Sequence, residues 1–79
     1  MTPEALIEAL GKEVRSRRRL KKLTQAGLAL RASVHPNTIS LIERAQTPVG
    51  FDALVDIANA LGTTVSQLLK SAEDRASPR

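Results

Sequence analysis

The sequence predicts an all-α fold, a compact domain of five helices, and two observations carry this prediction. Apolar residues recur at spacings of three and four along most of the chain, which is the period of a helix that buries one face. The core must be aliphatic, because the 79 residues include no Trp, no Tyr and a single Phe. A chain this short buries only about 60% of its unfolded surface, which is enough for one domain with a modest core.

The first helix is expected over residues 3–21. Thr2 and Pro3 mark its start, because a Thr side chain caps free backbone N–H groups and Pro lacks the N–H that would otherwise stay unpaired. Its apolar residues at helical spacing are Leu6, Ile7, Leu10, Val14, Leu20 and Leu23. We expect this face to pack against the rest of the domain.

Two shorter helices should follow, at residues 25–32 and 36–44. Thr24 is the candidate N-cap of the first of them. Pro36 suits the first helical position of the second, with His35 before it as the cap. Only a few residues join the two, so they should lie next to each other.

The last two helices are expected after residue 50. The fourth has the clearest apolar pattern, and Gly62 is well placed as its C-terminal stop. Its apolar residues are Phe51, Leu54, Val55, Ile57, Ala58 and Leu61. The run Thr64-Val-Ser-Gln67 has the form of a capping box and should start the fifth helix. We place the domain at residues 1–71 and expect a flexible tail at 72–79.

The basic residues are concentrated in one segment. Seven of the twelve Lys and Arg residues lie between Lys12 and Lys22, and the formal net charge of the chain is +4. A concentrated basic patch on a small domain is typical of proteins that bind nucleic acid or an anionic membrane surface. A solvated helix face is the alternative, because the basic residues of the segment 15–22 cannot all share one side of a helix.

The composition leaves little material for catalysis. With no Cys, one His and scattered carboxylates, the chain offers no thiolate, no cluster of metal ligands and no nucleophile beside a base. We therefore expect no enzyme, no metal and no cofactor, and we interpret His35 as a cap or a solvent-exposed residue. No apolar run approaches the roughly 20 residues of a membrane span, and we identify no targeting segment, so we expect a cytoplasmic protein without a membrane partner.

The order of the elements favours DNA as the ligand. Two short helices follow a basic one, and this arrangement can place the second of them in the major groove, which is about 12 Å wide. The residues also resemble the Cro/CI-type helix-turn-helix regulators, known as the XRE family or lambda repressor-like domains. The matching motifs are Leu10-Gly11, Val14-Arg15, Arg18, Leu23-Thr24-Gln25, Leu28-Ala29, Val34, Thr38-Ile39-Ser40, Ile42-Glu43-Arg44, Leu54, Ile57-Ala58, Ala60-Leu61-Gly62 and Leu68-Leu69.

The resemblance implies a five-helix lambda repressor-like domain with the helix-turn-helix at its second and third helices. It also implies a set of DNA contacts: Arg15, Lys22, Gln25, Pro36, Asn37, Thr38, Ser40, Leu41 and Arg44. Gln25 would contact a phosphate and brace the recognition helix. Asn37 is the first choice for a base contact, because its amide can pair with adenine through two hydrogen bonds. Arg18 would be structural, paired with Glu43.

The sequence departs from the family pattern at several positions. Ser33 and Ala45 stand where the family usually has Gly, and His35 where it has Ser or Thr, so both turns are expected to be built differently. Pro36 replaces a position that is often polar, which removes one hydrogen-bonding side chain. Arg17 stands where an apolar residue is common, so its side chain would snorkel or the first helix would be rotated slightly.

These observations predict a sequence-specific transcriptional regulator, a repressor that binds an inverted-repeat operator as a homodimer. One domain contacts few bases, so two copies would share double-stranded DNA with their recognition helices about 34 Å apart. Val65, Leu68 and Leu69 would close the core or, in part, form the dimer contact.

Two other functions stay open. An antitoxin, or another interaction module of a toxin–antitoxin or restriction–modification operon, would hold a partner such as a toxin on the exposed Leu30 and the apolar last helix. A general binder of nucleic acid or membrane surfaces would use the first helix alone. Its affinity for DNA would not depend on base sequence or on Asn37.

Overall fold

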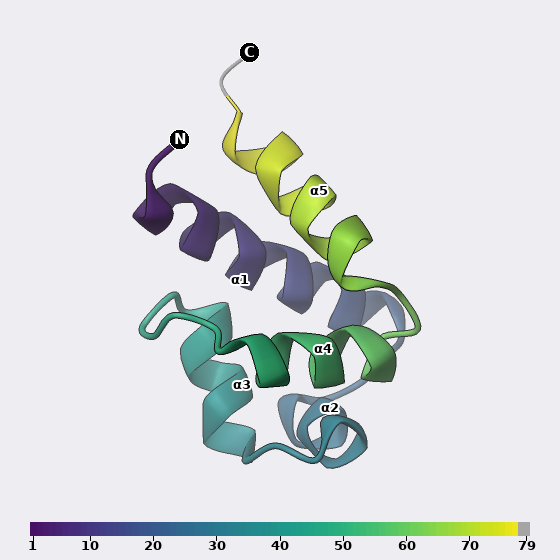
Figure 1. Cartoon of the computed structure of the whole chain (residues 1–79). Helices are drawn as coiled ribbons and strands as arrows, with labels where there is room; N and C mark the ends of the chain where they lie inside the picture. Colours follow the sequence, from purple (N-terminus) through teal and green to yellow (C-terminus); the bar gives the residue numbers. More distant parts are fainter. Residues whose placement is uncertain (78–79) are drawn as a thin grey trace.

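The computed structural model describes residues 1–77, and the regular structure in this range consists of five α-helices (Figure 1). They are α1 (Pro3–Leu20), α2 (Gln25–Ala32), α3 (Pro36–Glu43), α4 (Phe51–Ala60) and α5 (Val65–Ala76). The all-α class and the order of five helices are confirmed.

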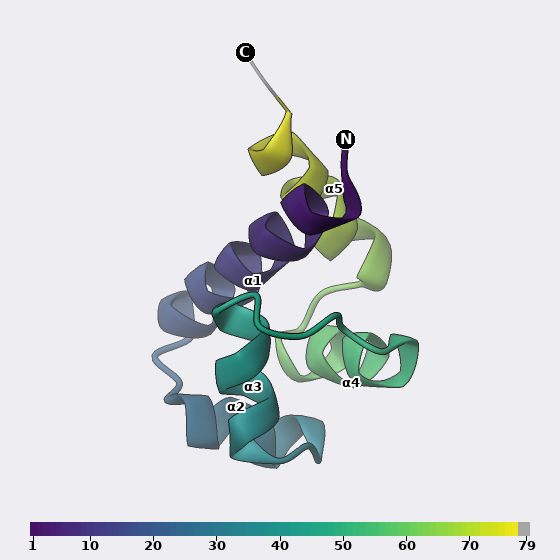
Figure 2. The same cartoon turned by 90° about the vertical axis from the view of Figure 1, so that its left-hand side faces the viewer.

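The long helix α1 is the element on which much of the fold is assembled. α5 packs along α1, α3 contacts α1 at another side, and α2 contacts both α3 and α4. Figure 1 shows α5 and the α2–α3 pair on opposite sides of α1, and Figure 2 shows α4 away from the C-terminal end of α1. The approach of α1 to α3 requires Gly11, because a Cβ atom there would overlap the carbonyl oxygen of Ile42.

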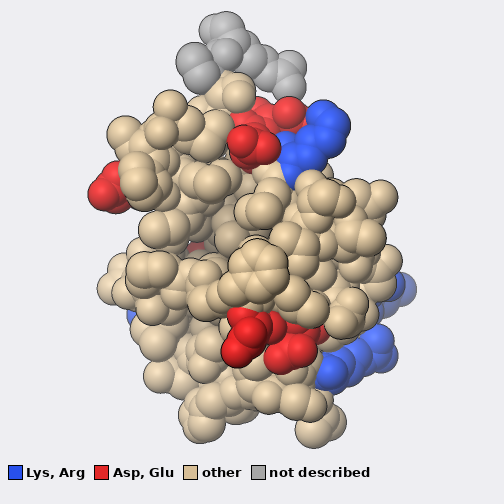
Figure 3. Space-filling view, in the orientation of Figure 1, with Lys and Arg blue, Asp and Glu red and all other residues tan. Residues whose placement is uncertain are grey.

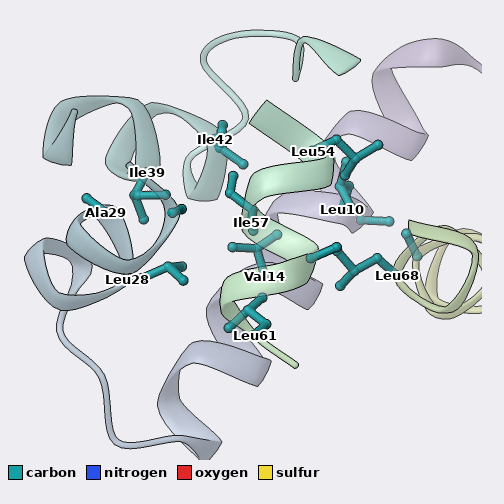
Figure 4. Close-up of a cluster of buried hydrophobic side chains, with 14 residues drawn as sticks. Leu10, Val14, Leu28, Ala29, Ile39, Ile42, Leu54, Ile57, Leu61 and Leu68 are labelled. Carbon is teal, nitrogen blue, oxygen red and sulfur yellow. The ribbon is translucent and has the colours of Figure 1, made fainter. Parts of the chain in front are cut away.

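The core lies where the helices meet and is aliphatic (Figure 4). Its most deeply buried large side chains, each at most 2% exposed, are Val14, Leu28, Ile39, Ile42, Ile57 and Leu68. Burying one side chain of this size contributes about 1.5–3 kcal/mol. Two residues of the predicted apolar faces are largely exposed, because Leu20 is 80% exposed and Phe51 is 73% exposed. Each is the terminal residue of its helix, where the packed face ends.

Side chains cap four of the five helices at the predicted starts. The capping residues are Thr2, Thr24, His35 and Thr64. The predicted capping box of α5 is half formed, because the Gln67 side chain accepts a hydrogen bond from the Thr63 hydroxyl at 2.7 Å. The cap from Thr64 to the backbone N–H of Gln67 is present at 3.1 Å.

The first four helices end in the same way. After each, one residue takes the left-handed conformation and two successive N–H groups bond back to carbonyls of the last turn, which is the Schellman motif. Only the fourth of these ends has a glycine, Gly62, and the others have Lys22, Ser33 and Ala45 at φ of 55–58°. The expectation that Ser33 and Ala45 would build different turns is therefore wrong, because both adopt the conformation that favours Gly.

α5 extends beyond the predicted end of the domain. The helix continues to Ala76, Ala72 is fully buried, and Nε of Arg75 donates to Oε1 of Glu13 at 2.7 Å. Residues 72–76, which were expected in a flexible tail, are therefore part of the helical domain. The part of the predicted tail at residues 78–79 lies outside the described residues.

Candidate nucleic-acid interface

A hydrogen-bond network around Glu43 joins α1, α2 and α3. Arg18 donates to both carboxylate oxygens of Glu43, at 2.6 and 3.0 Å, and to the carbonyl oxygen of Leu23 at 2.8 Å. Gln25, the first residue of α2, donates to the same carboxylate at 3.2 Å. The hydrogen bond to Glu43 raises the pKa of Arg18, although burial alone would lower it. Because Glu43 is the last residue of α3, the network fixes this helix against the other two.

The predicted pairing of Arg18 with Glu43 is confirmed, and so is part of the predicted role of Gln25. The Gln25 amide braces α3 through Glu43, as expected. Its contact with a DNA phosphate stays a prediction. Arg18 and Gln25 lie 25 and 18 residues before Glu43 in the sequence, so the network forms only when the helix-turn-helix is folded.

α3 divides into an inner and an outer face. Ile39 and Ile42 are buried in the core, as predicted. The remaining predicted contacts of this helix stay accessible in whole or in part, and they are Pro36, Asn37, Thr38, Ser40 and Leu41. Arg44 follows the helix, is exposed, and donates through Nε to the Ser40 hydroxyl at 3.2 Å. The residues predicted to contact DNA therefore form one continuous surface along α3.

A row of exposed cations follows one flank of α1. Lys12, Arg15 and Arg19 are exposed and are spaced three or four residues apart, so they share one side of the helix. The exposed Lys22 follows just after the end of the helix and completes the row. Three of them, Lys12, Arg15 and Arg19, also line an open groove between α1 and the end of α5. Sequence reasoning named Arg15 and Lys22 but missed Arg19, although its spacing from Arg15 was a usable signal.

Arg17 is half-buried between α1 and α5 and does not belong to this row. Its Nε donates to Oε2 of Glu13 at 2.6 Å, and its Nη2 donates to the Ser71 hydroxyl at 3.2 Å. Arg75 completes the cluster on Glu13. Burial acts to raise the pKa of Glu13, but the hydrogen bonds from Arg75 and Arg17 outweigh it and lower that pKa. This cluster fastens α5 to α1, and it explains why an arginine replaces the expected apolar residue.

Acidic side chains gather on a different face, over α4. In Figure 3, where α4 lies toward the viewer as in Figure 1, a red acidic patch lies over this helix, and Lys or Arg show only near the edges. Asp52 and Asp56 are exposed one turn apart on α4. Phosphates would be repelled from this face, so the charge distribution disfavours DNA binding on the side of α4.

The residues expected at a dimer contact differ in burial. Leu68 is fully buried and closes the core, which is the first of the two roles expected for it, so no part of its side chain is exposed for a contact with a second copy. Val65 and Leu69 are half-buried against the core. The exposed apolar side chains are instead Met1, Leu20, Leu30 and Phe51.

The described part of the chain gives no sign of two other kinds of site. None of its helices has both the length and the apolar character of a membrane span. No three His, Asp or Glu side chains within residues 1–77 are grouped as metal ligands would be.

Comparison with known proteins places these features in context. A helix-turn-helix family model matches residues 14–68, which include the Glu43 network and all of α2, α3 and α4. The control protein C.SmaI of Serratia marcescens is 37% identical over 62 residues, which make up 78% of this chain and 74% of that protein.

Two solved structures have the same fold. The clp gene regulator ClgR of Corynebacterium glutamicum matches with a TM-score of 0.85 and 34% identity over 94% of this chain and 96% of its own. The restriction-modification controller protein C.AhdI of Aeromonas hydrophila matches with a TM-score of 0.76 and 26% identity, covering 78% of this chain and 94% of its own.

Proposed function

This chain belongs to the XRE-type helix-turn-helix family of DNA-binding transcriptional regulators, and from that membership we propose that it is a repressor that binds an inverted-repeat operator as a homodimer. In this proposal α3 enters the major groove. Asn37 contacts a base, and Gln25, Arg15 and Lys22 contact phosphates.

The observation that carries the proposal is the fixed position of an accessible α3. The buried Glu43 carboxylate accepts hydrogen bonds from α1 and α2, so α3 is held rigidly while its outer face remains free for DNA. A rigid recognition helix loses little conformational entropy on binding, which favours specific recognition. The family consists of DNA-binding regulators, so we propose no enzymatic activity and a cytoplasmic location, where the DNA is.

Selection from a random duplex pool at near-physiological salt tests this proposal directly. We expect enrichment of an inverted repeat with half-sites about one helical turn apart. On the selected site Asn37→Ala should cost about 1–3 kcal/mol, with a much smaller loss on scrambled DNA. Asn59→Ala removes an exposed Asn from α4 and is the matched control. Tight, salt-sensitive binding without any motif would refute sequence-specific recognition by α3.

We assign the dimer contact to the exposed apolar surface at the start of α4. Phe51 is the only aromatic residue of the chain and is 73% exposed. In this assignment the half-buried Val65 and Leu69 of α5 contribute further apolar surface to the contact. Phe51→Ser should shift the sedimentation coefficient to that of a monomer. Leu30→Ser, which alters an equally exposed residue on α2, should not.

A more specific candidate is control of a restriction–modification operon. Two similar proteins are a control protein and a restriction-modification controller, and these support the candidate, whereas the similar ClgR is a clp gene regulator. The selected site should then lie upstream of restriction or methyltransferase genes. A toxin partner held by Leu30 remains the alternative, and co-purification with the product of an adjacent toxin gene would favour it.

A further inference from the structure

The start of α3 contains a side chain that the proposed function leaves unused. Nδ1 of His35 accepts a hydrogen bond from the backbone N–H of Asn37 at 3.0 Å, and the His35 carbonyl accepts one from Thr38 at 2.9 Å. A ring nitrogen that accepts a hydrogen bond carries no proton, so the proton of the neutral imidazole is on Nε2. The cap therefore assigns Nε2 as a hydrogen-bond donor.

This donor has no acceptor within the described part of the protein. His35 is exposed, and none of the side-chain hydrogen bonds or ion pairs among residues 1–77 involves its Nε2. The first turn of α3 contains no acidic residue, and the charged residue in the last turn of α2 is the cation Arg31. The two ring nitrogens lie on different edges of the imidazole, so Nε2 is directed away from the amide that Nδ1 caps.

We propose that His35 is a DNA contact as well as the N-cap of α3. Its Nε2–H donates to an acceptor on the DNA beside the start of this helix, either a phosphate oxygen or N7 or O6 of a guanine. This inference rests on the proposed function, because it requires α3 to lie in the groove.

The neighbouring residue strengthens the assignment. Pro36 is the first residue of α3 and has no hydrogen-bonding side chain, so the polar groups closest to this end of the helix are those of His35 and Asn37. An imidazole reaches farther than the Ser or Thr that the resemblance implies at this position. One ring can therefore order the first turn of α3 with one edge and hold DNA with the other.

Two substitutions separate the cap from the DNA contact. His35→Asn keeps an acceptor near the place of Nδ1 and has no atom at the place of Nε2, and Asn is a strong N-cap. We expect its thermal midpoint to stay unchanged while its Kd for the selected duplex rises roughly tenfold. His35→Gln places an amide N–H near the position of Nε2 but loses the cap. It should melt a few degrees lower and should bind the duplex more tightly than His35→Asn at a temperature where both are folded.

The DNA acceptor is identified with modified duplexes. Replacing single phosphates by neutral methylphosphonates should abolish the difference between wild type and His35→Asn at one position if a phosphate is the acceptor. Replacing guanine by 7-deazaguanine should do so if the acceptor is N7.

The outcomes distinguish this inference from the proposed function. If the wild-type protein selects a motif and His35→Asn binds it equally well, His35 is only a cap and the inference is overturned. If the wild-type protein selects no motif, the proposed function fails and the inference fails with it. His35→Ser, which also preserves a strong cap, repeats the measurement should Asn lower the thermal midpoint.

Discussion

Among single residues, Glu43 connects the fold most directly to DNA binding. Its carboxylate is buried at the end of the recognition helix and accepts hydrogen bonds from Arg18 and Gln25. The resemblance to known regulators was enough to predict the pairing of Arg18 with Glu43. It was not enough to predict the cluster on Glu13. The Arg17–Glu13 pair joins residues four apart within α1, but the contacts of this cluster with Ser71 and Arg75 depend on the position of α5.

Gly11 is the residue at which added volume should be tolerated least. A methyl group there would overlap the carbonyl oxygen of Ile42 and lie 3.1 Å from that of Glu43, and neither backbone atom can rotate away. We expect Gly11→Ala to lower the free energy of unfolding by about 1–3 kcal/mol and to weaken DNA binding, because α3 must shift. Denaturant unfolding measures the first effect.

Gly27→Ala is the control, because its Cβ would meet mainly the Thr24 hydroxyl, at 3.2 Å. Its free energy of unfolding should change by less than about 1 kcal/mol. Equal losses for the two variants would contradict the close approach of α1 and α3.

Glu13 should make stability depend on acidic pH. Its pKa is lowered in the folded state, so its contribution to stability is complete above the pKa of the unfolded chain and disappears as the pH falls through the folded pKa. At pH 7, Glu13→Gln should therefore lower the free energy of unfolding by about 1–3 kcal/mol. This loss of stability should become smaller as the pH falls below the usual pKa of a glutamate side chain.

The matched control is Glu8→Gln, which removes a glutamate from an exposed pair with Lys12 on the same helix. It should change stability little at any pH. A deficit for Glu13→Gln that stays constant between neutral and acidic pH would rule out the proposed role of its charge.

At the scale of helices, the starts were predictable and the ends were less so. Thr2, Thr24 and Thr64 cap their helices through local hydrogen bonds, so their sequence signals are short-range. The end of α5 depends instead on Ala72 and Arg75 meeting α1, which no local pattern contains. For the same reason the exposure of Leu20 and Phe51 could not be inferred from their apolar character.

The residues that follow α2 and α3 in the left-handed backbone conformation should be stabilised, not destabilised, by substitution with glycine. Ser33 and Ala45 have φ of 56° and 55°, a conformation that costs an L-residue roughly 1–2 kcal/mol. Ser33→Gly and Ala45→Gly should each raise the free energy of unfolding by up to about 1 kcal/mol, after the greater entropy of glycine in the unfolded chain is subtracted.

Ala26→Gly is the matched control for Ala45→Gly, because Ala26 is exposed within α2. It should lower the free energy of unfolding by about 0.5–1 kcal/mol. Thermal or denaturant unfolding of the variants tests whether the sign of an Ala→Gly change follows the backbone conformation.

Across the whole molecule, charge is unevenly distributed. The exposed cations of α1 would attract a polyanion and the acidic patch over α4 would repel it, so the domain has a preferred orientation toward DNA. The concentration of basic residues was evident from the sequence. The sequence alone did not show which of these residues form the exposed row, that Arg18 is buried against Glu43, or that Arg17 is half-buried beside α5, because these positions depend on the packing of α1 between α3 and α5.

Reversing a charge on the row should weaken binding to all sequences alike. Lys22→Glu is expected to reduce affinity for both selected and random duplexes. It should also reduce the magnitude of the slope of log K against log salt concentration by about 1 or more. Lys70→Glu, on the exposed side of α5, is the control and should leave the slope nearly unchanged. Loss of affinity for the selected site alone would argue against a phosphate contact at Lys22.

The exposed aromatic ring on α4 also makes this chain unusually simple to study by spectroscopy. Because the protein contains no Trp or Tyr, it is nearly dark in the near ultraviolet, and Phe51 lies on the surface rather than in the core. A Trp placed at position 51 would be the sole fluorophore of the molecule. Its emission would shift to shorter wavelength whenever a second copy excluded water from that face, so dilution alone would report the assembly equilibrium without any label.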